Sequence, residues 1–200
     1  MSERRDVILI FGQTGSGKTT WLKEGLARRP RVLLLDADFE ELPVAYFDGI
    51  PALVYYLQGR NCFGTLVPFR AGCTPQPWDY ETGFETALAL KNVDLVLEEA
   101  DRFDVEHLDA YAEVIVRGRH HGVGLLAASL HPFAISKEVR RQATRVISFR
   151  QTDPEDLRWI SFLVGDAAWD LPDYPAHEFL DWRADGELKI RQKHALGPRT

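Results

Sequence analysis

Residues 12–19 read GQTGSGKT, a complete G-x-x-x-x-G-K-[ST] motif. The motif follows the apolar run VILIF at residues 7–11, which predicts a strand, and precedes a segment that can form a helix from Thr19 to Arg29. Glycines let consecutive backbone N–H groups curl around phosphate oxygens, and the start of the helix attracts anions further. A strand, a glycine-rich loop and a helix in this order therefore predict a phosphate-binding site.

The residues of this loop have separate expected roles. Lys18 is expected to place its ammonium group against the β- and γ-phosphates of a nucleotide, and the hydroxyl group of Thr19 to bind Mg²⁺. The residues predicted to surround the nucleotide are Gly12, Gln13, Thr14, Gly15, Ser16, Gly17, Lys18, Thr19 and Thr20.

Further apolar runs recur along the chain: VLLLD at 32–36, VDLVLEE at 93–99, VGLLAAS at 123–129 and VISF at 146–149. Runs without polar alternation are typical of strands buried on both faces, as in a parallel sheet between two layers of helices. Helices are expected between most of them: at 83–91, on the apolar stripe of Val105, Leu108, Ala112 and Ile115, and from the N-cap pair Asp153–Pro154 to about Val164. This alternation predicts the α/β class, with a mainly parallel central sheet flanked by helices.

The chain length suits one domain over residues 1–200, with a core at about 6–165 and a C-terminal extension at about 166–200. Within the extension, two short strands around Asp185–Gly186 predict a small hairpin. Prolines and glycines loosen the pattern between residues 39 and 82, where a strand is expected at 65–69.

Two adjacent carboxylates end the run VDLVLEE. A buried strand that ends in carboxylates is costly unless a cation or a reacting water lies beside them. Glu98 is expected to hold Mg²⁺, and Glu99 to orient or deprotonate the attacking water, unless one of the two only caps the helix that follows near Asp101. A carboxylate pair at this place favours hydrolysis over transfer to a second substrate, which predicts an NTPase.

Asp36 and Asp38 follow the neighbouring strand, and in a parallel sheet they point toward the same edge as the acidic pair. They either support the site from behind or end the strand in solvent.

Composition excludes several other classes. The formal net charge of -6 lacks the basic excess of a stand-alone nucleic-acid binder, so any contact with nucleic acid must be local. Cys62 and Cys73 have neither metal-ligand spacing nor a disulfide framework, and they are expected to be unreactive thiols. No stretch approaches the roughly eighteen apolar residues that a membrane-spanning helix needs, so the chain is expected to be soluble and not itself transmembrane.

The succession GQTGSGKT, LLLDAD, LVLEEAD, RGRHHGVGLLAASLHP and ATRVISFRQTDPEDL resembles the FtsK/HerA superfamily of DNA-pumping ATPases over about residues 6–160. In that superfamily a helix after the acidic pair leads to an RxxGV turn, a strand that ends near ATQRP, and another strand that ends in FR. The matching residues here are Arg119, Gly122, Val123, Ala128, Pro132, Phe149 and Arg150. The resemblance implies a RecA-like P-loop NTPase core, and it implies that the nucleotide is ATP.

One position departs from the superfamily. Leu130 stands where the family usually carries a glutamine that senses the γ-phosphate. The resemblance therefore leaves two candidates for this role, Ser129 and His131.

An arginine delivered from a neighbouring subunit can stabilise the charge that builds on the γ-phosphate during hydrolysis. Arg119 is the first candidate for this trans-acting residue. Arg145 and Arg150, on either side of the next predicted strand, are alternatives, as is the simple solvation of all three.

Cellular members of the superfamily carry an additional N-terminal barrel or membrane module, for which no room is expected ahead of Gly12. A minimal core is similar to the genome-packaging ATPases of tailless, membrane-containing double-stranded DNA viruses. This implies a DNA-translocating subunit of a viral or provirus packaging motor, assembled as a homo-oligomeric ring, expected to be a hexamer. The expected location is the host cytoplasm or the virion vertex, with a capsid vertex protein or a membrane-associated viral protein as a candidate partner.

The expected nucleic-acid partner is double-stranded DNA, bound independently of sequence because no base-reading module is present. The first candidate contacts are Lys137, Arg140 and Arg141, and further candidates are Lys189, Arg191, Lys193 with His194, and the region from Arg60 to Arg70. An ordinary solvated face remains the alternative for these clusters.

Three other functions stay open: a small P-loop nucleoside or nucleotide kinase, a Zot-like phage morphogenesis ATPase, and a nucleotide-dependent scaffold that hydrolyses slowly. Phosphate release stimulated by duplex DNA favours the motor, and transfer to an acceptor favours the kinase.

Overall fold

A computed structural model of the chain describes residues 6–37, 42–103 and 105–192. The strands are β1 (Val7–Phe11), β2 (Arg31–Asp36), β3 (Ala45–Phe47), β4 (Phe69–Cys73), β5 (Val93–Glu98), β6 (Val123–Ser129), β7 (Arg145–Ser148), β8 (Glu178–Arg183) and β9 (Leu188–Gln192). The α-helices are α1 (Lys18–Ala27), α2 (Gly49–Gly59), α3 (Tyr80–Leu90), α4 (Asp109–His121), α5 (Lys137–Gln142) and α6 (Pro154–Val164), with short 3₁₀ turns η1 (Pro77–Asp79), η2 (Ala100–Arg102), η3 (Pro132–Ala134) and η4 (Gly165–Asp173).

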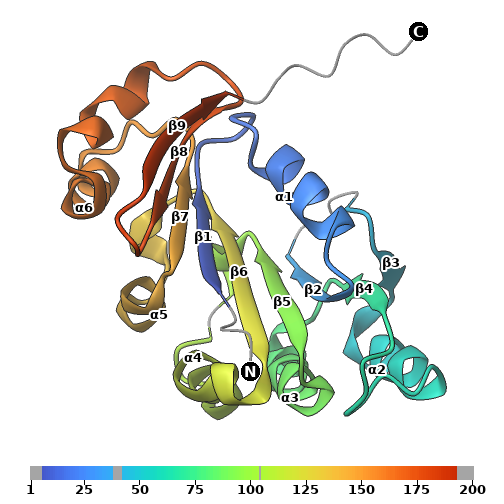
Figure 1. The fold of residues 1–200 in the computed structure, drawn as a ribbon. Coiled ribbons are helices and arrows are strands. Elements are labelled where there is room, and N and C mark those ends of the chain that lie inside the picture. Colours follow the sequence, from blue (N-terminus) through green and yellow to red (C-terminus); the bar gives the residue numbers. More distant parts are fainter. Residues whose placement is uncertain (1–5, 38–41, 104, 193–200) are drawn as a thin grey trace, which may run out of the picture.

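The strands form one nine-stranded sheet in the order β3-β4-β2-β5-β6-β1-β7-β8-β9 (Figure 1). Strands β1 to β7 are parallel, whereas β8 and β9 are antiparallel and extend the edge beyond β7. The strand β1, which leads into the glycine-rich loop, lies between β6 and β7. The predicted α/β class and mainly parallel sheet are confirmed.

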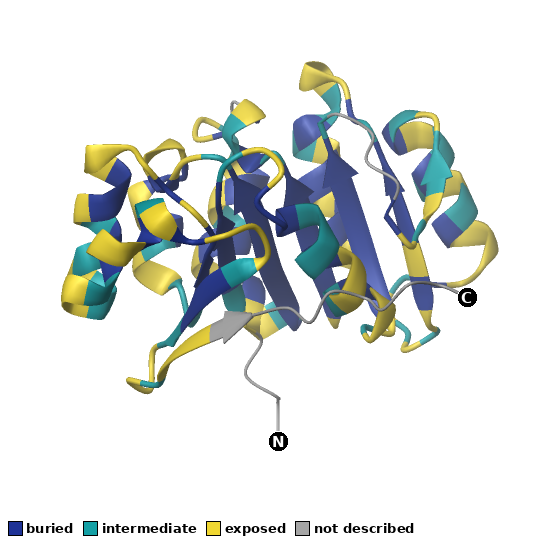
Figure 2. Cartoon of the chain, turned by 90° about the horizontal axis from the view of Figure 1, so that it is seen from above, coloured by how far each residue is buried: buried dark blue, intermediate teal, exposed yellow. Residues whose placement is uncertain are grey.

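Successive residues of the central strands face two different cores, because side chains alternate across a strand. Leu9, Phe11 and Leu33 pack in the core that contains α2, α3 and α4, whereas Ile8 and Ile10 pack with Leu22 and Leu26 of α1 on the other face. A third core joins α6, η4 and β8. The central strands are therefore buried on both faces (Figure 2), as the unbroken apolar runs predict.

Several elements differ from the sequence-based expectations; the helix expected at 83–91, for example, is α3 at Tyr80–Leu90. The strand expected at 65–69 is wrong in position, since β4 begins at Phe69 and pairs with β2 and β3. The stripe around Val105 also begins too early: α4 starts only at Asp109, although Val105 is still buried in the core beside it. The loosely patterned region contains the helix α2, which was not expected because prolines and glycines punctuate the sequence there. Pro51 lies close to the start of α2, where proline is tolerated.

Both cysteines belong to the core that contains α2, α3 and α4. Both Cys62 and Cys73 are buried and free, and burial raises the pKa of the Cys73 thiol to about 12. Of the helices in the described ranges, none combines the length and the apolar character that crossing a bilayer requires. The hairpin predicted around Asp185–Gly186 is confirmed as β8 and β9.

Candidate active site

The glycine-rich loop between β1 and α1 is held against the end of β7 and the start of β8. A Cβ atom on Gly12 would lie 2.6 Å from Cβ of Phe149, and one on Gly17 would lie 2.8 Å from Nδ1 of His177. Gly17 has φ 119, a value that side-chain-bearing residues rarely adopt. The loop therefore needs glycine at both positions, and the neighbouring backbone fixes its path: the N–H of Gln13 donates to the carbonyl of Arg150 (3.2 Å), and that of His177 to the carbonyl of Ser16 (2.8 Å).

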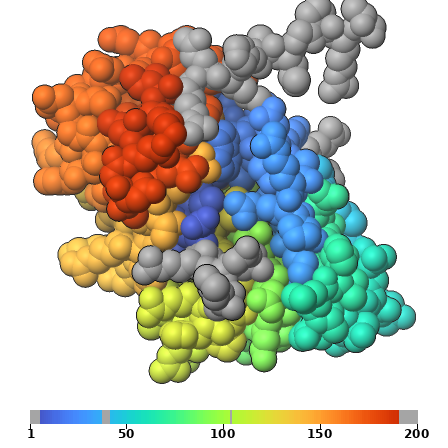
Figure 3. Space-filling model, viewed as in Figure 1, coloured from blue at the N-terminus to red at the C-terminus, as the bar shows by residue number. Residues whose placement is uncertain are grey.

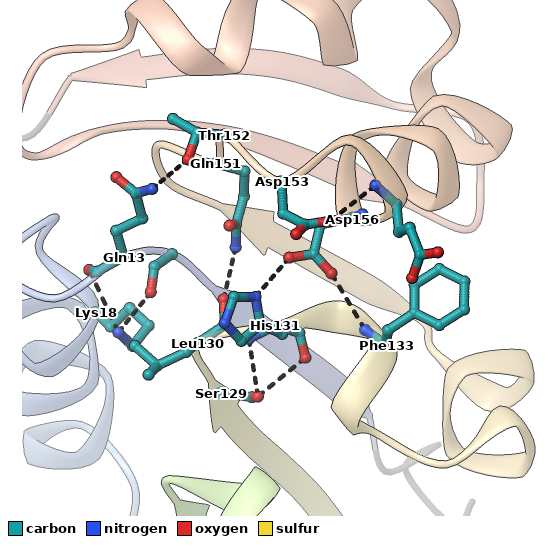
Figure 4. Close-up of polar contacts among 12 residues, drawn as sticks. Gln13, Lys18, Ser129, Leu130, His131, Phe133, Gln151, Thr152, Asp153 and Asp156 are labelled. Carbon is teal, nitrogen blue, oxygen red and sulfur yellow. Dashed lines mark hydrogen bonds and ion pairs between the residues drawn. The ribbon is translucent and has the colours of Figure 1, made fainter.

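Lys18 lies inside this loop (Figure 4). Its Nζ donates to the carbonyl oxygens of Gly12 at 2.6 Å and Gln13 at 3.4 Å, and the residue is buried. Gln13 is in turn tied to the segment after β7, because its Nε2 donates to Oγ1 of Thr152 at 2.6 Å. The ammonium group is thus positioned at the start of α1, where the helix dipole also favours an anion.

Thr19 and Glu98, 79 residues apart in the chain, meet across the sheet edge. The hydroxyl group of Thr19 donates to Oε1 of Glu98 at 3.4 Å, and Glu98 is 2% exposed as the last residue of β5. These residues fit a magnesium ion, since hydroxyl and carboxylate oxygens are hard ligands and Mg²⁺ is usually held by one or two protein oxygens together with substrate phosphates and water.

Glu99 differs from Glu98 in both backbone and side chain. It adopts the left-handed conformation (φ 52, ψ 51), and its Oε2 lies 2.9 Å from Nε of Arg102. A left-handed residue with a side chain costs about 1 kcal/mol and is enriched at functional sites. The kink turns Glu99 away from the strand direction, so that the two adjacent carboxylates occupy different environments.

Asp36 lies at the same end of the neighbouring strand, opposite Glu98 in the register of β2 and β5. It is buried, and one of its carboxylate oxygens accepts a hydrogen bond from the hydroxyl group of Tyr46 at 2.6 Å. Of the two readings that the sequence left open, ending the strand in solvent is therefore wrong for Asp36. Asp38 lies outside the described residues.

The end of β6 runs beside the glycine-rich loop, since Ser129 is the register partner of Phe11. The side chain of Ser129 makes local hydrogen bonds with the backbone of His131. Its Oγ donates to the carbonyl of His131 (3.0 Å) and accepts from the N–H of the same residue (3.2 Å). Leu130 carries no polar side chain, and its carbonyl oxygen accepts a hydrogen bond from Nε2 of the buried Gln151 (2.9 Å). Gln151 thereby ties the end of β6 to the segment after β7.

An aspartate–histidine pair that the sequence analysis missed lies at the same place. Nδ1 of His131 lies 2.7 Å from Oδ2 of Asp156. The other carboxylate oxygen of Asp156, Oδ1, accepts a hydrogen bond from the N–H of Phe133 at 3.4 Å. The side chain of Asp156 is 2% exposed and that of His131 is 53% exposed, so the carboxylate is fixed and the imidazole faces outward. Asp156 is in the first turn of α6, and no local motif relates it to a residue 25 positions away.

The arginines considered for trans action differ in their surroundings. Arg119 is in the last turn of α4 and lines a cavity of about 330 Å³ with Val7 and Val123, at the beginning of the strands. Arg145 forms a paired ion contact with the buried Asp181 and lies over the ring of Trp21, which makes it part of the packing. Arg150 is exposed beside the loop that holds Gln13.

The expected DNA-contacting cluster is only partly free for a ligand. Arg140 lies over the rings of Phe133 and Trp159, and burial lowers the pKa of its guanidinium from the usual value. Lys137 and Arg141 are exposed, and all three line a groove of about 590 Å³ with Trp159 and other residues. Of the second cluster, Lys193, His194 and the side chain of Arg191 lie outside the described residues.

The sheet and the glycine-rich loop together define a P-loop NTPase fold. The sheet is mostly parallel, a strand–loop–helix holds a buried lysine, and the strand β5 supplies a carboxylate.

Known protein families give no sequence-profile match to the chain, and no curated protein matches it in sequence. Solved structures do match. The chain is similar to the genome packaging NTPase B204 from Sulfolobus turreted icosahedral virus 2 in complex with ATP-gammaS, with a TM-score of 0.77, 19% identity, and coverage of 95% of this chain and 98% of that chain.

Two larger proteins contain a similar fold. The pCW3 conjugation coupling protein TcpA matches with a TM-score of 0.62 and 16% identity, over 96% of this chain and 60% of that chain. The cytoplasmic domain of the Thermomonospora curvata type VII secretion ATPase EccC matches with a TM-score of 0.60 and 18% identity, over 96% and 26%. These neighbours confirm the predicted P-loop NTPase fold.

Proposed function

We propose that this protein is an ATP-hydrolysing subunit of a DNA-translocating genome-packaging motor. The observation that supports this most is the contact between Thr19 and Glu98, which joins the glycine-rich loop to the acidic end of β5 within a fold shared, over nearly the full length of both chains, with a viral genome packaging NTPase. That neighbour's complexes with AMPPCP and ATP-gammaS support ATP as the nucleotide here.

Binding of the triphosphate follows from the loop. The N–H groups of the loop and of the first turn of α1 would surround the phosphates, and Lys18 would exchange its contacts with the carbonyls of Gly12 and Gln13 for the β- and γ-phosphates. Thr19 and Glu98 would hold Mg²⁺. When bound, the metal supplies positive charge to the phosphate oxygens and helps to align them.

Hydrolysis requires a water that attacks the γ-phosphorus in line with the leaving oxygen. Glu99 is the proposed residue that orients this water and accepts its proton, because it directly follows the metal-holding Glu98 and its kinked backbone gives its carboxylate a separate direction. The contact with Arg102 fixes that carboxylate until substrate binds. Arg119 of a neighbouring subunit is the proposed cation that completes the site.

The proposed assembly is a homo-oligomeric ring, expected to be a hexamer, with ATP at the subunit interfaces. Its proposed substrate is double-stranded DNA, with Lys137 and Arg141 as exposed candidate contacts. Contacts with the phosphate backbone would be independent of sequence. A capsid vertex or a membrane-associated viral protein is the proposed docking partner, and the host cytoplasm or the virion vertex the proposed location.

The proposal is tested with Glu99→Gln, which keeps the size of the side chain and removes the base. We expect ATP affinity, measured with a fluorescent ATP analogue, to change less than about threefold, and phosphate release to fall by about 10²–10⁴-fold. Glu85→Gln is the matched control, because Glu85 is an exposed glutamate on α3. Wild-type phosphate release should also rise with duplex DNA. Unchanged turnover in Glu99→Gln would remove Glu99 from its role, and phosphate transfer to an acceptor in place of water would indicate a kinase.

A further inference from the structure

We propose that a groove lined by arginines at the amino ends of β2 and β4 binds the phosphate backbone of duplex DNA, an inference that rests on the proposed function. The groove has a volume of about 520 Å³. It is formed by the end of α1, the end of α2, β3 and the beginning of β4. The lining residues are Ala27, Arg28, Arg29, Pro30, Pro43, Val44, Ala45, Tyr56, Arg60, Pro68, Phe69 and Arg70, named here the arginine groove.

The position of the arginine groove leaves the nucleotide site accessible. In a parallel sheet the amino ends of all strands lie at one edge and the carboxyl ends at the other. The glycine-rich loop follows the carboxyl end of β1, and Glu98 is the last residue of β5. Arg70, by contrast, is the second residue of β4 and so lies at the opposite edge of the sheet. Figure 3 shows the surface of α1 (blue) beside that of the α2–β4 region (teal), so the elements that line the groove adjoin on one face of the molecule.

The described residues that line the groove carry charge of one sign, since they include arginines at positions 28, 29, 60 and 70 and no carboxylate. Only Arg29 is neutralised, by Asp94 at 2.9 Å; the ion pairs found within the described ranges include none of Arg28, Arg60 or Arg70. A local excess of three positive charges stands out on a chain whose formal net charge is -6. Such a patch attracts polyanions.

Two arginines of the groove, Arg60 and Arg70, are held in place before any ligand binds. Arg60 ends α2 and lies over the ring of Tyr56, with its guanidinium carbon 5.6 Å from the ring centre. Tyr56 in turn packs on Phe47. Arg70 donates from Nη1 to the carbonyl of Ala27 at 2.6 Å, at the end of α1. Preorganised guanidinium groups lose less side-chain entropy when they bind phosphate.

A purely structural explanation accounts for only part of this cluster. Cations are favourable at the C-terminal ends of helices, which explains the capping contact of Arg70. Arg31, by comparison, shows what a fully structural arginine looks like here: it is 3% exposed and donates to several backbone carbonyls, among them Val67 and Cys62. Arg28 and Arg60 are exposed and make no comparable set of bonds, so their guanidinium groups can reach a ligand.

Duplex DNA fits these features better than a free nucleotide does. The guanidinium groups come from three separate elements along an open groove, which suits the repeated phosphates of a backbone. The other basic cluster, formed by Lys137, Arg140 and Arg141, is less suited, because Arg140 is partly buried whereas Arg28 and Arg60 are exposed. The arginine groove lies beside β3 and β4, at one edge of the sheet, whereas the cluster of Lys137, Arg140 and Arg141 is on α5, which precedes β7 (Figure 1). The two clusters can therefore be tested separately.

The test is Arg28→Gln/Arg60→Gln in the full chain, which leaves the cap made by Arg70 in place. Binding of a fluorescein-labelled 30-bp duplex is measured by anisotropy at several KCl concentrations; the length is chosen as about three helical turns. We expect affinity to fall at least about tenfold and the slope of log K against log salt to decrease by about two, because each phosphate contact contributes about 0.9 to that slope. Basal ATP hydrolysis should stay unchanged, and its stimulation by DNA should be reduced.

Two controls separate charge from folding. Lys23→Gln/Arg158→Gln removes the same charge from exposed positions on α1 and α6, and it should retain most of the affinity. Arg28→Lys/Arg60→Lys keeps the positive charges and should recover much of the affinity for duplex DNA. Thermal unfolding of every variant, followed by circular dichroism, checks that each is folded.

The proposal is overturned if Arg28→Gln/Arg60→Gln binds duplex as the charge-matched control does while the wild type binds well. It is equally overturned if the double variant loses affinity for a fluorescent ATP analogue and keeps its affinity for duplex, since the groove would then serve free nucleotide. A wild-type protein that binds no duplex at any salt concentration removes both this inference and the DNA-translocating function, whereas the first outcome removes only the inference.

Discussion

At the scale of single residues, the clearest distinction is between arginines that hold the fold and arginines that can act on a ligand. Arg145 meets Asp181 through two hydrogen bonds of 2.7 and 2.8 Å, and Asp181 is only 1% exposed. Removing one partner of such a pair leaves a buried charge without compensation. Arg145 therefore serves to join β7 to β8, although its place beside a strand made it a candidate for trans action from sequence alone.

This distinction predicts that Asp181→Ala destabilises the protein by about 3–5 kcal/mol. The control is Glu187→Ala, which removes a partner from the exposed contact with Arg183 and should change stability by less than about 1 kcal/mol. Urea unfolding followed by circular dichroism measures both. Equal, small effects would show that the Arg145–Asp181 pair contributes little, and would return Arg145 to the candidates for catalysis.

Residue types at fixed spacing made much of the site predictable. The loop motif and the acidic strand end are local patterns, and the structure brings Thr19 and Glu98 together as expected. The pair formed by His131 and Asp156, and the packing of His177 against Gly17, have no local signature, because each depends on how α6 and β8 join the sheet. Such contacts follow only from tertiary structure.

At the scale of elements, the contact between the end of β6 and α6 bears on Leu130, the position where the superfamily that the sequence resembles carries a glutamine. Ser129 is used in local bonds with the backbone of His131, so of the two candidates for the sensor it is the less available. His131 has one ring nitrogen fixed by Asp156 on α6, and its side chain is half-exposed at the strand end beside β1. We therefore assign the proposed sensing role to His131, with Asp156 as its positioning residue.

This assignment predicts a defined series of effects on turnover. His131→Ala should lower kcat about 10–100-fold with a smaller change in KM, because a donor that acts on developing charge contributes mainly in the transition state. Asp156→Asn should lower kcat as well, by loss of the ring orientation. His131→Gln should recover part of the rate, since the amide group of glutamine can also donate a hydrogen bond. If His131→Ala turns over at the wild-type rate, or if all three variants differ only in thermal stability, the pair is structural.

The elements that sequence predicted well are those with continuous apolar composition. The runs that form β1 and β6 match their strands residue for residue, since strands buried on both faces need no polar alternation. The weakest region was 39–82, where Pro51 and nearby glycines suggested loops. There α2 packs Leu53 and Leu57 into the core, and tertiary burial outweighs its poor local helix signals.

At the scale of the whole molecule, the sheet separates the two proposed sites. The nucleotide site lies at the carboxyl ends of the parallel strands, whereas both Arg119 and the arginine groove lie at their amino ends. The net charge of the chain predicted only that any contact with nucleic acid is local, and folding gathers arginines from separate segments into one groove. Composition could not reveal this, because only the fold decides which charges are neighbours.

The separation of the two sheet edges determines which nucleotide site Arg119 can reach. Arg119 and Lys18 of one chain lie at opposite edges of one sheet, so Arg119 can complete only a site on another subunit. We expect Lys18→Ala and Arg119→Ala each to be inactive alone. Mixed in equal amounts, they should recover about a quarter of the wild-type rate, since half of the subunits keep Lys18 and half of their neighbours in a head-to-tail ring keep Arg119.

A matched control for this mixture is Arg119→Ala combined with the double variant Lys18→Ala/Arg119→Ala, in which no subunit supplies the arginine. Phosphate release is measured after the mixtures are incubated to exchange subunits, with exchange followed by energy transfer between labelled chains. Recovery in the first mixture and none in the second is the expected result, because only the first contains both halves of a site. If subunits exchange and neither mixture recovers activity, Arg119 does not act across an interface, and the exposed Arg150 beside the loop becomes the candidate to examine.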